Sequence, residues 1–298
     1  MSNFKNKKRK FLNSSMVWGL NAMRWAMGNL PQWFVKVNIA ILTPIVYLFM
    51  GKHKQICRRN FKLVYGIEKD EIEYDRMIKR CLVNVSIVMA DMLYYIKRPF
   101  MFEKIIHIHH EERLIEAQKK GKGVVCVSAH MGNFPLMFMM LSKKGYKVNV
   151  IIRPMRNKRF SKFMFDLCAE WGIKMIQTVP RRRFIKETFG ALKRNELLFI
   201  LLDEVVPTDV GVEVDFFGTS VRRATGPFLF EKKFGSAIVP MFITKDVDNN
   251  FHIHVEPGVE GNASSEEENV SELTGIIEDY VREYPLQWGG WFNKRWAS

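Results

Sequence analysis

Short apolar runs separated by amphipathic stretches fill the chain between residues 104 and 283. The run VVCV at 124–127 is apolar throughout and rich in β-branched residues, which is typical of a strand buried on both faces. Similar runs predict strands at 104–110, 147–153, 173–177, 197–203, 237–244 and 251–256, with an extended segment at 212–217. Helical spacing predicts helices after His130 and at 111–120, 157–171, 182–194, 226–234 and 264–283. This alternation predicts an α/β fold with a mostly parallel central sheet flanked by helices.

The N-terminal part of the chain has a helical pattern with a strongly apolar start. Residues 15–50 are rich in Trp, Phe and Met, and the stretch 37–50 is almost wholly apolar. That stretch is shorter than the roughly 20 residues of a bilayer span and contains Asn38 and Pro44. We therefore expect one or two helices that lie in a membrane interface, with a spanning anchor as the alternative.

Two further amphipathic helices are expected at 52–66 and 70–95, between this segment and the first strand. The basic arm NFKNKKRK at 3–10 precedes the apolar segment and suits anionic headgroups. The predicted organisation is therefore a basic arm with interfacial helices over residues 1–50 and an α/β domain over residues 51–298.

The charge of the chain indicates a polyanionic partner. The 46 Lys and Arg against 31 Asp and Glu leave a formal net charge of +15, which suits nucleic acid, an anionic membrane or an acidic protein. The 23 Phe and 17 Met favour lipid, and no nucleic-acid-binding motif is present. A hydrophobic share of 47% excludes a polytopic membrane protein. The four scattered cysteines are expected to be reduced core residues.

Polar side chains end three of the predicted strands. His130, Arg153 and Asp203 each stand at a carboxyl end, and these ends converge at one edge of a parallel sheet. Further basic residues at or near that edge suit phosphate, namely Arg181, Arg182, Arg183, Arg222 and Arg223. The alternative is that these arginines are solvated loop residues. The histidines at 107–110 and 252–254 lack a ligand at matching spacing, so we expect no metal site.

At this stage the sequence resembles a known family, the bacterial lipid A biosynthesis (lauroyl/myristoyl) acyltransferases of the lysophospholipid acyltransferase superfamily. No single motif is specific, but their order and spacing from about residue 30 to residue 296 are similar to those of the family. The matching pieces are NFKLVYG at 60–66, GKGV at 121–124, HMGNF at 130–134, Arg153-Pro154, Leu202-Asp203, VDFFG at 214–218, Thr225-Gly226-Pro227, Val239-Pro240, PLQW at 285–288, Trp291 and Arg295-Trp296.

The resemblance implies a membrane-associated enzyme that moves a fatty acyl chain from an acyl thioester to a lipid hydroxyl. His130 would take the proton of that hydroxyl, and donors near Gly132 and Asn133, or Arg153, would stabilise the oxyanion. The arginine clusters, with Thr225 and Gly226, would bind anionic parts of the substrates. The expected partners are an anionic membrane surface, acyl carrier protein or acyl-CoA and a lipid A precursor or related lysolipid or glycolipid, with no nucleic acid and no cofactor besides the thioester. We expect a monomer on the cytoplasmic face of the bacterial inner membrane, peripheral or monotopic.

One position departs from the family pattern. The family has a carboxylate five positions after the histidine, hydrogen-bonded to it, and this chain has Pro135 there. Asp203 is the expected replacement because its strand ends at the same edge of the sheet, and Glu204 is the second choice. The alternative function is a catalytically weakened or inactive lipid-binding member of the family.

Overall fold

The computed structural model describes residues 18–293 apart from residues 20, 23, 66–69, 156, 208–209 and 262–264. The basic arm at 3–10 and the motif residues 295–296 lie outside this part of the chain, so the predictions for them stay predictions. A seven-stranded sheet has the order β1-β9-β8-β2-β5-β3-β4. Its strands are β1 (Ile106–His109), β2 (Val124–Ser128), β3 (Val148–Ile152), β4 (Lys174–Gln177), β5 (Leu197–Leu201), β8 (Ala237–Lys245) and β9 (Phe251–Val255). Strands β8, β2, β5, β3 and β4 are parallel, whereas β9 runs antiparallel to β8. The prediction of a mostly parallel α/β sheet is confirmed.

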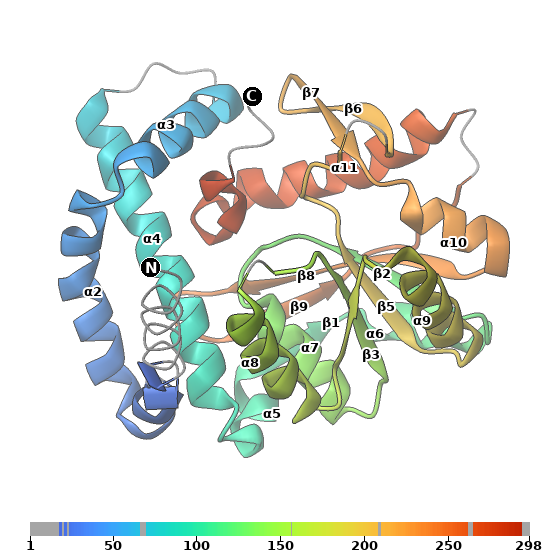
Figure 1. Cartoon of the computed structure of the whole chain (residues 1–298), viewed down its shortest axis with the longest axis horizontal. Coiled ribbons are helices and arrows are strands. Elements are labelled where there is room, and N and C mark those ends of the chain that lie inside the picture. The colour runs from blue at the N-terminus through green and yellow to red at the C-terminus, as the bar shows by residue number, and fades with distance from the viewer. Residues whose placement is uncertain are drawn as a thin grey trace, which may run out of the picture.

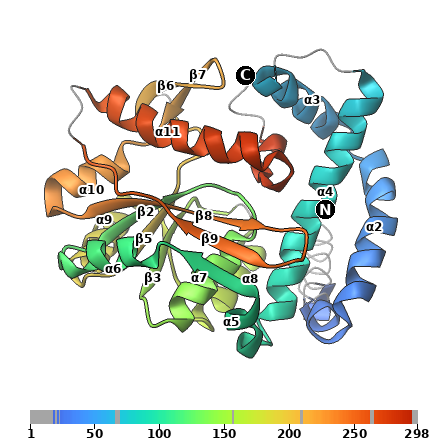
Figure 2. The same cartoon turned by 180° about the vertical axis from the view of Figure 1, so that it is seen from behind.

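Strand β2 lies in the middle of the sheet and is buried over its whole length. Its residues alternate between two hydrophobic clusters, with Val125 and Val127 in one and Val124 and Cys126 in the other. Helices α9 (Arg181–Lys193), α10 (Gly226–Phe234) and α11 (Glu266–Glu283) contribute to the first cluster. Helices α5 (Phe102–Ile105), α6 (Glu111–Lys119), α7 (Phe134–Lys143) and α8 (Lys158–Ala169) contribute to the second. Figures 1 and 2 show α11 and α7 on opposite sides of the sheet.

Three helices stand beside the α/β body. They are α2 (Gln32–Leu48), α3 (Gly51–Tyr65) and α4 (Glu71–Tyr95), and both cartoons show α2 running along α4 (Figures 1 and 2). Within the described residues, no single helix is long and apolar enough to cross a membrane. The pair α2 and α3 meets the length and composition requirements together but is bent by 98°.

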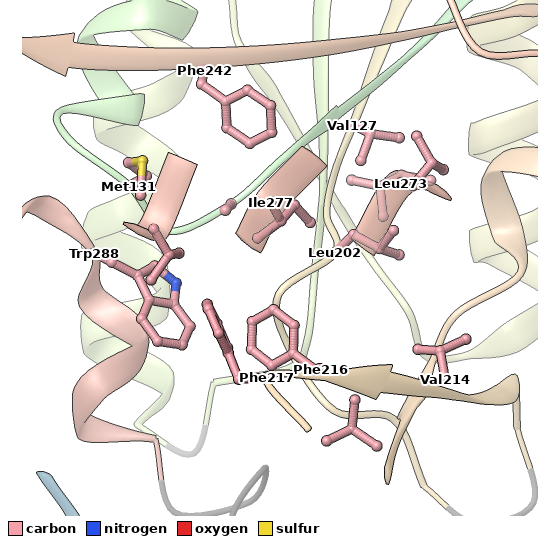
Figure 3. Close-up of a cluster of buried hydrophobic side chains, with 14 of the residues drawn as sticks. Val127, Met131, Leu202, Val214, Phe216, Phe217, Phe242, Leu273, Ile277 and Trp288 are labelled. Carbon is pink, nitrogen blue, oxygen red and sulfur yellow. The ribbon is translucent and has the colours of Figure 1, made fainter. Parts of the chain in front are cut away.

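The C-terminal segment returns to the central strands. Short 3₁₀ turns at Pro285–Gln287 and Gly289–Phe292 place Trp288 and Trp291 in the core, both fully buried. The Trp291 ring stacks on Phe61 of α3 with centroids 4.1 Å apart, which ties the segment to the N-terminal helices. Figure 3 shows Trp288 close to Phe217 and Phe216, with Met131 on its other side. The last turns of the chain therefore pack against the loop that follows β2.

A two-stranded hairpin is the element that the sequence pattern predicted only in part. The extended segment expected at 212–217 is β6 (Val212–Phe216), and it pairs with β7 (Thr219–Arg223), for which no strand was predicted. Helix α11 packs against β6. All four cysteines are free, and Cys57, Cys81 and Cys126 are buried.

Candidate active site

The loop after β2 holds His130 in a fixed position because the C-terminal segment binds its backbone. The N–H of Gly289 donates to the carbonyl oxygen of His130 at 2.7 Å, and the N–H of Gly132 donates to that of Gln287 at 2.9 Å. Gly132 has φ +51°, and a Cβ there would lie 2.0 Å from the carbonyl oxygen of Ile243. Only glycine combines this left-handed conformation with so close a backbone approach.

His130 and Asp203 form a hydrogen-bonded pair. His130 Nδ1 and Asp203 Oδ1 lie 2.9 Å apart, and the backbone N–H of His130 donates to Asp203 Oδ2 at 3.0 Å. Strands β2 and β5 are neighbours in the sheet, and their last pair is Ser128 with Leu201. His130 and Asp203 each follow two residues later, so they meet. A carboxylate only accepts, so Nδ1 carries the proton and the Nε2 lone pair is left for a substrate. The structure therefore brings together the two side chains expected to form the catalytic pair.

Asp203 is buried and has a third donor. It is 3% exposed, and the indole N–H of Trp288 donates to Oδ2 at 2.9 Å. Burial raises the pKa of Asp203, but the charge of His130 and the hydrogen bonds from His130 and Trp288 outweigh it and lower the pKa overall. The carboxylate is thus kept ionised in a buried position, as a partner of an imidazolium must be.

The pKa of His130 is raised above its ordinary value of 6.5. Burial lowers the pKa, and the negative charge and hydrogen bond of Asp203, with a smaller effect of Glu204, more than reverse this. The positive charge of Arg153 acts in the opposite direction. The site therefore favours the imidazolium, the form that a general base reaches when it has taken a proton.

A cavity of about 680 Å³ opens at His130. This volume is within the roughly 300–1,000 Å³ of ligand pockets. One wall is apolar and consists of Val85, Val88, Met89 and Met92 of α4 with Phe134 and Pro135 of α7. Asn133 caps α7 by accepting from the N–H of Leu136, so Pro135 lies in the first turn, where proline needs no donor. Pro135 is thus part of the apolar wall.

Arg153 also lines the cavity and is paired with Glu204. Arg153 Nε and Glu204 Oε2 lie 3.2 Å apart, and Arg153 also donates to the carbonyl oxygen of Val205. Glu204, the second choice for the histidine's partner, is therefore engaged with Arg153, while Asp203 contacts His130. A smaller cavity of about 310 Å³ on the β3 and β5 side shares His130, Arg153 and Glu204 with the first.

Two of the expected oxyanion donors are engaged elsewhere. The Gly132 N–H donates to Gln287, and the Asn133 side-chain amide donates to the carbonyl oxygen of Val88 at 3.1 Å. The first contact fixes the loop to the C-terminal segment, and the second fixes it to α4. Among the three expected donors, this leaves Arg153 as the charged group that faces the cavity.

The arginine clusters do not meet at His130. Arg181, Arg182 and Arg183 are exposed in the first turn of α9, after β4, and line neither cavity. Arg222 binds the carbonyl oxygens of Val210 and Gly211 and the carboxylate of Glu213. Thr225 and Gly226 start α10 and also line neither cavity.

Arg223, which was expected to bind an anionic part of a substrate, is instead buried in the core. Arg223 is on β7, its side chain is fully buried, and its guanidinium lies 4.2 Å from the ring centroid of Phe216. None of its three guanidinium nitrogens has a hydrogen-bond partner in the described part of the chain. Burial lowers the pKa of Arg223 to about 10, although the charges of Asp203 and Glu278 oppose this. The register of the hairpin turns every second side chain inward, and Arg223 is one of them.

No group of three or more His, Cys, Asp or Glu side chains is placed to hold a metal ion in the described ranges. The strand histidines instead stack on one another across β1 and β9, with His109 Nε2 and His252 Nδ1 2.9 Å apart. His252 also contacts Asp246, and His254 contacts Thr244.

Trp288 is the residue of the site to which the sequence analysis assigned no role. Its motif PLQW was recognised as part of the family pattern, but a tryptophan in such a motif gives no indication of which carboxylate its N–H reaches. The contact joins positions 85 residues apart, so it depends on the path of the last helix and cannot be read from local pattern.

Comparison with known sequences shows the family of this chain. The sequence profile of the family "Bacterial lipid A biosynthesis acyltransferase" matches residues 2–298, nearly the whole chain. The chain therefore belongs to the bacterial lipid A biosynthesis acyltransferase family, as its motifs indicated.

Individual relatives are distant and match only in part. A phosphatidylinositol mannoside acyltransferase of Mycobacterium tuberculosis is 26% identical over 129 residues, 43% of this chain and 41% of the relative. A lipid A biosynthesis acyltransferase of Haemophilus influenzae is 23% identical over 179 residues, 59% of this chain and 55% of the relative. The chain thus matches about half the length of these curated relatives.

Proposed function

We propose that this protein is an O-acyltransferase that moves a fatty acyl chain from an acyl thioester to a hydroxyl of a lipid A precursor or a related lysolipid or glycolipid. The observation that supports this most strongly is the His130–Asp203 pair, with Nε2 of the imidazole free at the mouth of a largely apolar cavity. Family membership and the names of the two relatives are consistent with lipid acyl transfer.

In the proposed reaction His130 is the general base. Nε2 takes the proton of the acceptor hydroxyl while the hydroxyl oxygen bonds to the thioester carbonyl carbon. The tetrahedral oxyanion then collapses, the C–S bond breaks, and the proton on Nε2 passes to the leaving thiolate. Asp203 holds the Nδ1–H tautomer and stabilises the imidazolium formed between the two steps.

The cavity offers complementary surfaces for the other parts of the reaction. The α4 and α7 wall of Val85, Val88, Met89 and Phe134 suits the acyl chain because it buries apolar surface. Arg153 is the proposed stabiliser of the oxyanion, since its guanidinium faces the same cavity as His130.

The acyl donor is proposed to be a thioester of acyl carrier protein, with acyl-CoA as the alternative. The three exposed arginines of α9 support this, because they add positive charge at a helix N-terminus, where cations do not stabilise the helix. An acidic carrier protein or the phosphates of either donor would bind such a cluster. The net charge of +15 supports the same class of partner.

Membrane association through the N-terminal helices is part of the proposal. Trp25 and Trp33 are 65% and 67% exposed, and Ile41, Leu48 and Phe49 of the same segment are exposed as well. An apolar face of this kind with lysines nearby suits an interfacial position on an anionic bilayer. This supports a peripheral or monotopic association with a membrane, which we propose to be the bacterial inner membrane at its cytoplasmic face.

The proposal is tested by incubating the purified protein with acyl carrier protein thioesters, or acyl-CoA, and a panel of lysolipid and glycolipid acceptors. Mass spectrometry should detect an ester product that is absent with the His130→Ala variant. Lipid binding without turnover for any pair would instead support the inactive lipid-binding alternative, in which the chemistry was lost with the carboxylate at position 135.

A further inference from the structure

A second cavity, of about 540 Å³, lies next to the His130 cavity on the other side of the loop after β2. The two share Val88, Gly132 and Gln287. The charged residues that line this cavity include Lys36 of α2, Asp91 of α4 and Lys245 of β8. None of these side chains has a part in the proposed acyl transfer.

The charged groups in this cavity are unevenly matched. Asp91 is 1% exposed, and its two oxygens accept from Lys245 at 2.7 Å and from Gln32 at 2.7 Å. Lys36 reaches a neutral acceptor instead, Asn249 Oδ1 at 3.1 Å. Two ammonium groups thus line the cavity beside Asp91, and its carboxylate accepts a hydrogen bond from Lys245, whereas Lys36 donates to Asn249. An ammonium group has three donors, so both lysines retain N–H groups for a further acceptor.

Asp246, the other carboxylate among the residues that line the cavity, is hydrogen-bonded to nearby Asn250 and His252. Asp246 accepts from the backbone and side-chain amides of Asn250 and lies 3.0 Å from His252 Nε2. The pKa of Lys36 is lowered by burial and by the positive charge of Lys245, against the opposing effect of Asp91. An anion between the two lysines would relieve this repulsion.

We propose that this cavity binds the phosphate group of a lipid, held between the ammonium groups of Lys36 and Lys245. The position favours a lipid as the source of the phosphate, because Lys36 is on the helix that also carries exposed Trp33 and Phe34. It also places the phosphate next to the cavity of His130, so that one head group could present its phosphate here and its hydroxyl there. Only the presentation of a hydroxyl to His130 rests on the proposed function.

Binding is measured by isothermal titration calorimetry with the full chain, with dihexanoyl phosphatidic acid below its micelle concentration as the lipid probe and inorganic phosphate as the free anion. Lys36→Gln should weaken binding of the phosphatidic acid by about 10-fold to 100-fold, the worth of a hydrogen bond between charged groups. Lys36→Arg should retain binding within a few-fold. Lys52→Gln, which removes one exposed charge from neighbouring α3, is the matched control and should leave binding unchanged.

Unchanged binding by Lys36→Gln would overturn the site. Inorganic phosphate binding as tightly as the lipid would overturn the assignment to a lipid head group, and binding at least tenfold weaker would support it. Lys36 is chosen over Lys245 because loss of Lys245 would leave buried Asp91 without a cation and could unfold the protein. The calorimetric test contains no thioester, so it does not depend on acyl transfer. If binding depends on Lys36 but the protein shows no transfer activity, the phosphate site is supported and the proposed function is contradicted.

Discussion

Asp203 has three hydrogen bonds at the centre of the site, and each comes from a different kind of donor. The imidazole and backbone N–H of His130 supply two, and the indole of Trp288 supplies the third. A carboxylate in this position orients the histidine and stabilises its charged form, which is the part that the family assigns to the residue at position 135. The orientation and charge of His130 therefore depend on the hydrogen bonds that hold Asp203.

Trp288→Phe keeps an aromatic six-membered ring and removes the five-membered ring with its N–H donor, as Trp291→Phe does at the control position. We expect the free energy of unfolding to fall by about 1.5–3 kcal/mol, because a buried carboxylate loses a hydrogen bond. Turnover by the folded variant should also fall, by up to about 100-fold, since small misplacements of a catalytic group are costly. Urea unfolding and steady-state kinetics measure the two effects separately.

Trp291→Phe is the matched control for this prediction. Its indole N–H donates to the carbonyl oxygen of Pro285 at 2.6 Å and is not bonded to Asp203. It should lose stability and keep its turnover. Equal turnover in the two variants would show that Trp288 has a purely structural role.

Arg223 predicts an unusual response to mutation. Its buried guanidinium has no hydrogen-bond partner among the described residues, so its desolvation is offset only by the Phe216 ring and distant carboxylates. Replacing even paired buried charges with well-packed apolar groups is often neutral or stabilises a protein by about 1–4 kcal/mol, because it removes the desolvation penalty. Arg223→Met is therefore expected to raise the free energy of unfolding in a urea titration.

The neighbouring Arg222 provides the comparison. It forms three contacts, so Arg222→Met should lower the free energy of unfolding by about 1 kcal/mol. A larger loss of stability for Arg223→Met than for Arg222→Met would mean that the buried guanidinium has partners that this account omits.

Among the structural elements, the loop between β2 and α7 positions the chemistry. The left-handed Gly132 lets the chain pass within van der Waals contact of β8 and brings its N–H to Gln287. Gly132→Ala should destabilise the protein by well over the roughly 1–2 kcal/mol of a left-handed conformation alone, because its Cβ would meet the Ile243 carbonyl oxygen. Chemical denaturation gives the difference.

Gly145→Ala separates the two causes. Gly145 also has a positive φ, +95°, but nothing lies within 4 Å of a Cβ there. It should show only the conformational cost. Similar losses at both positions would mean that the loop moves to accommodate the methyl group.

Apart from β7, the strands and helices between residues 106 and 283 follow closely from the hydrophobic pattern. Buried parallel strands such as β2 and β5 are continuous apolar runs, and the helices between them have one apolar face, so both patterns are local. The convergence of His130 and Asp203 could be expected for the same reason, since residues at the carboxyl ends of parallel strands share an edge. Adjacent strands β2 and β5 bring them within hydrogen-bond distance.

The features that were not predicted depend on tertiary structure. Strand β7 was missed because TSVRR at 219–223 is short, polar and lacks an apolar run. An arginine pair in a sequence indicates exposure. Arg223 is buried because the hairpin register places it opposite Val212, with its guanidinium over the Phe216 ring. The engagement of Gly132 and Asn133 depends on contacts with the C-terminal segment and α4.

In the molecule as a whole, helices α2 and α10 lie at opposite ends (Figures 1 and 2), and α2 carries the exposed side chains of Trp33 and Phe34. If α2 contacts the membrane, Trp33→Ser should weaken binding to vesicles of phosphatidylethanolamine and phosphatidylglycerol by roughly tenfold, as loss of a large buried apolar side chain would. Co-sedimentation measures the partition. Leu229→Ser on α10, where the leucine is 55% exposed, should bind as the unmodified protein does. Equal losses in both variants, or none in either, would contradict the proposed orientation.

In the proposed mechanism Asp203 supports His130 as the base for acyl transfer. The pH dependence of kcat/KM tests these two roles. A base acts unprotonated, so the rate of the unmodified protein should fall as the pH drops through the raised pKa of His130, above 6.5. Asp203→Asn removes the main cause that raises this pKa while burial still lowers it, so the acid limb should move to lower pH. Its maximal rate should fall by about 10²–10⁴-fold, close to that of His130→Ala, because the pair acts as a unit. Full turnover by folded Asp203→Asn with an unchanged acid limb would contradict the account.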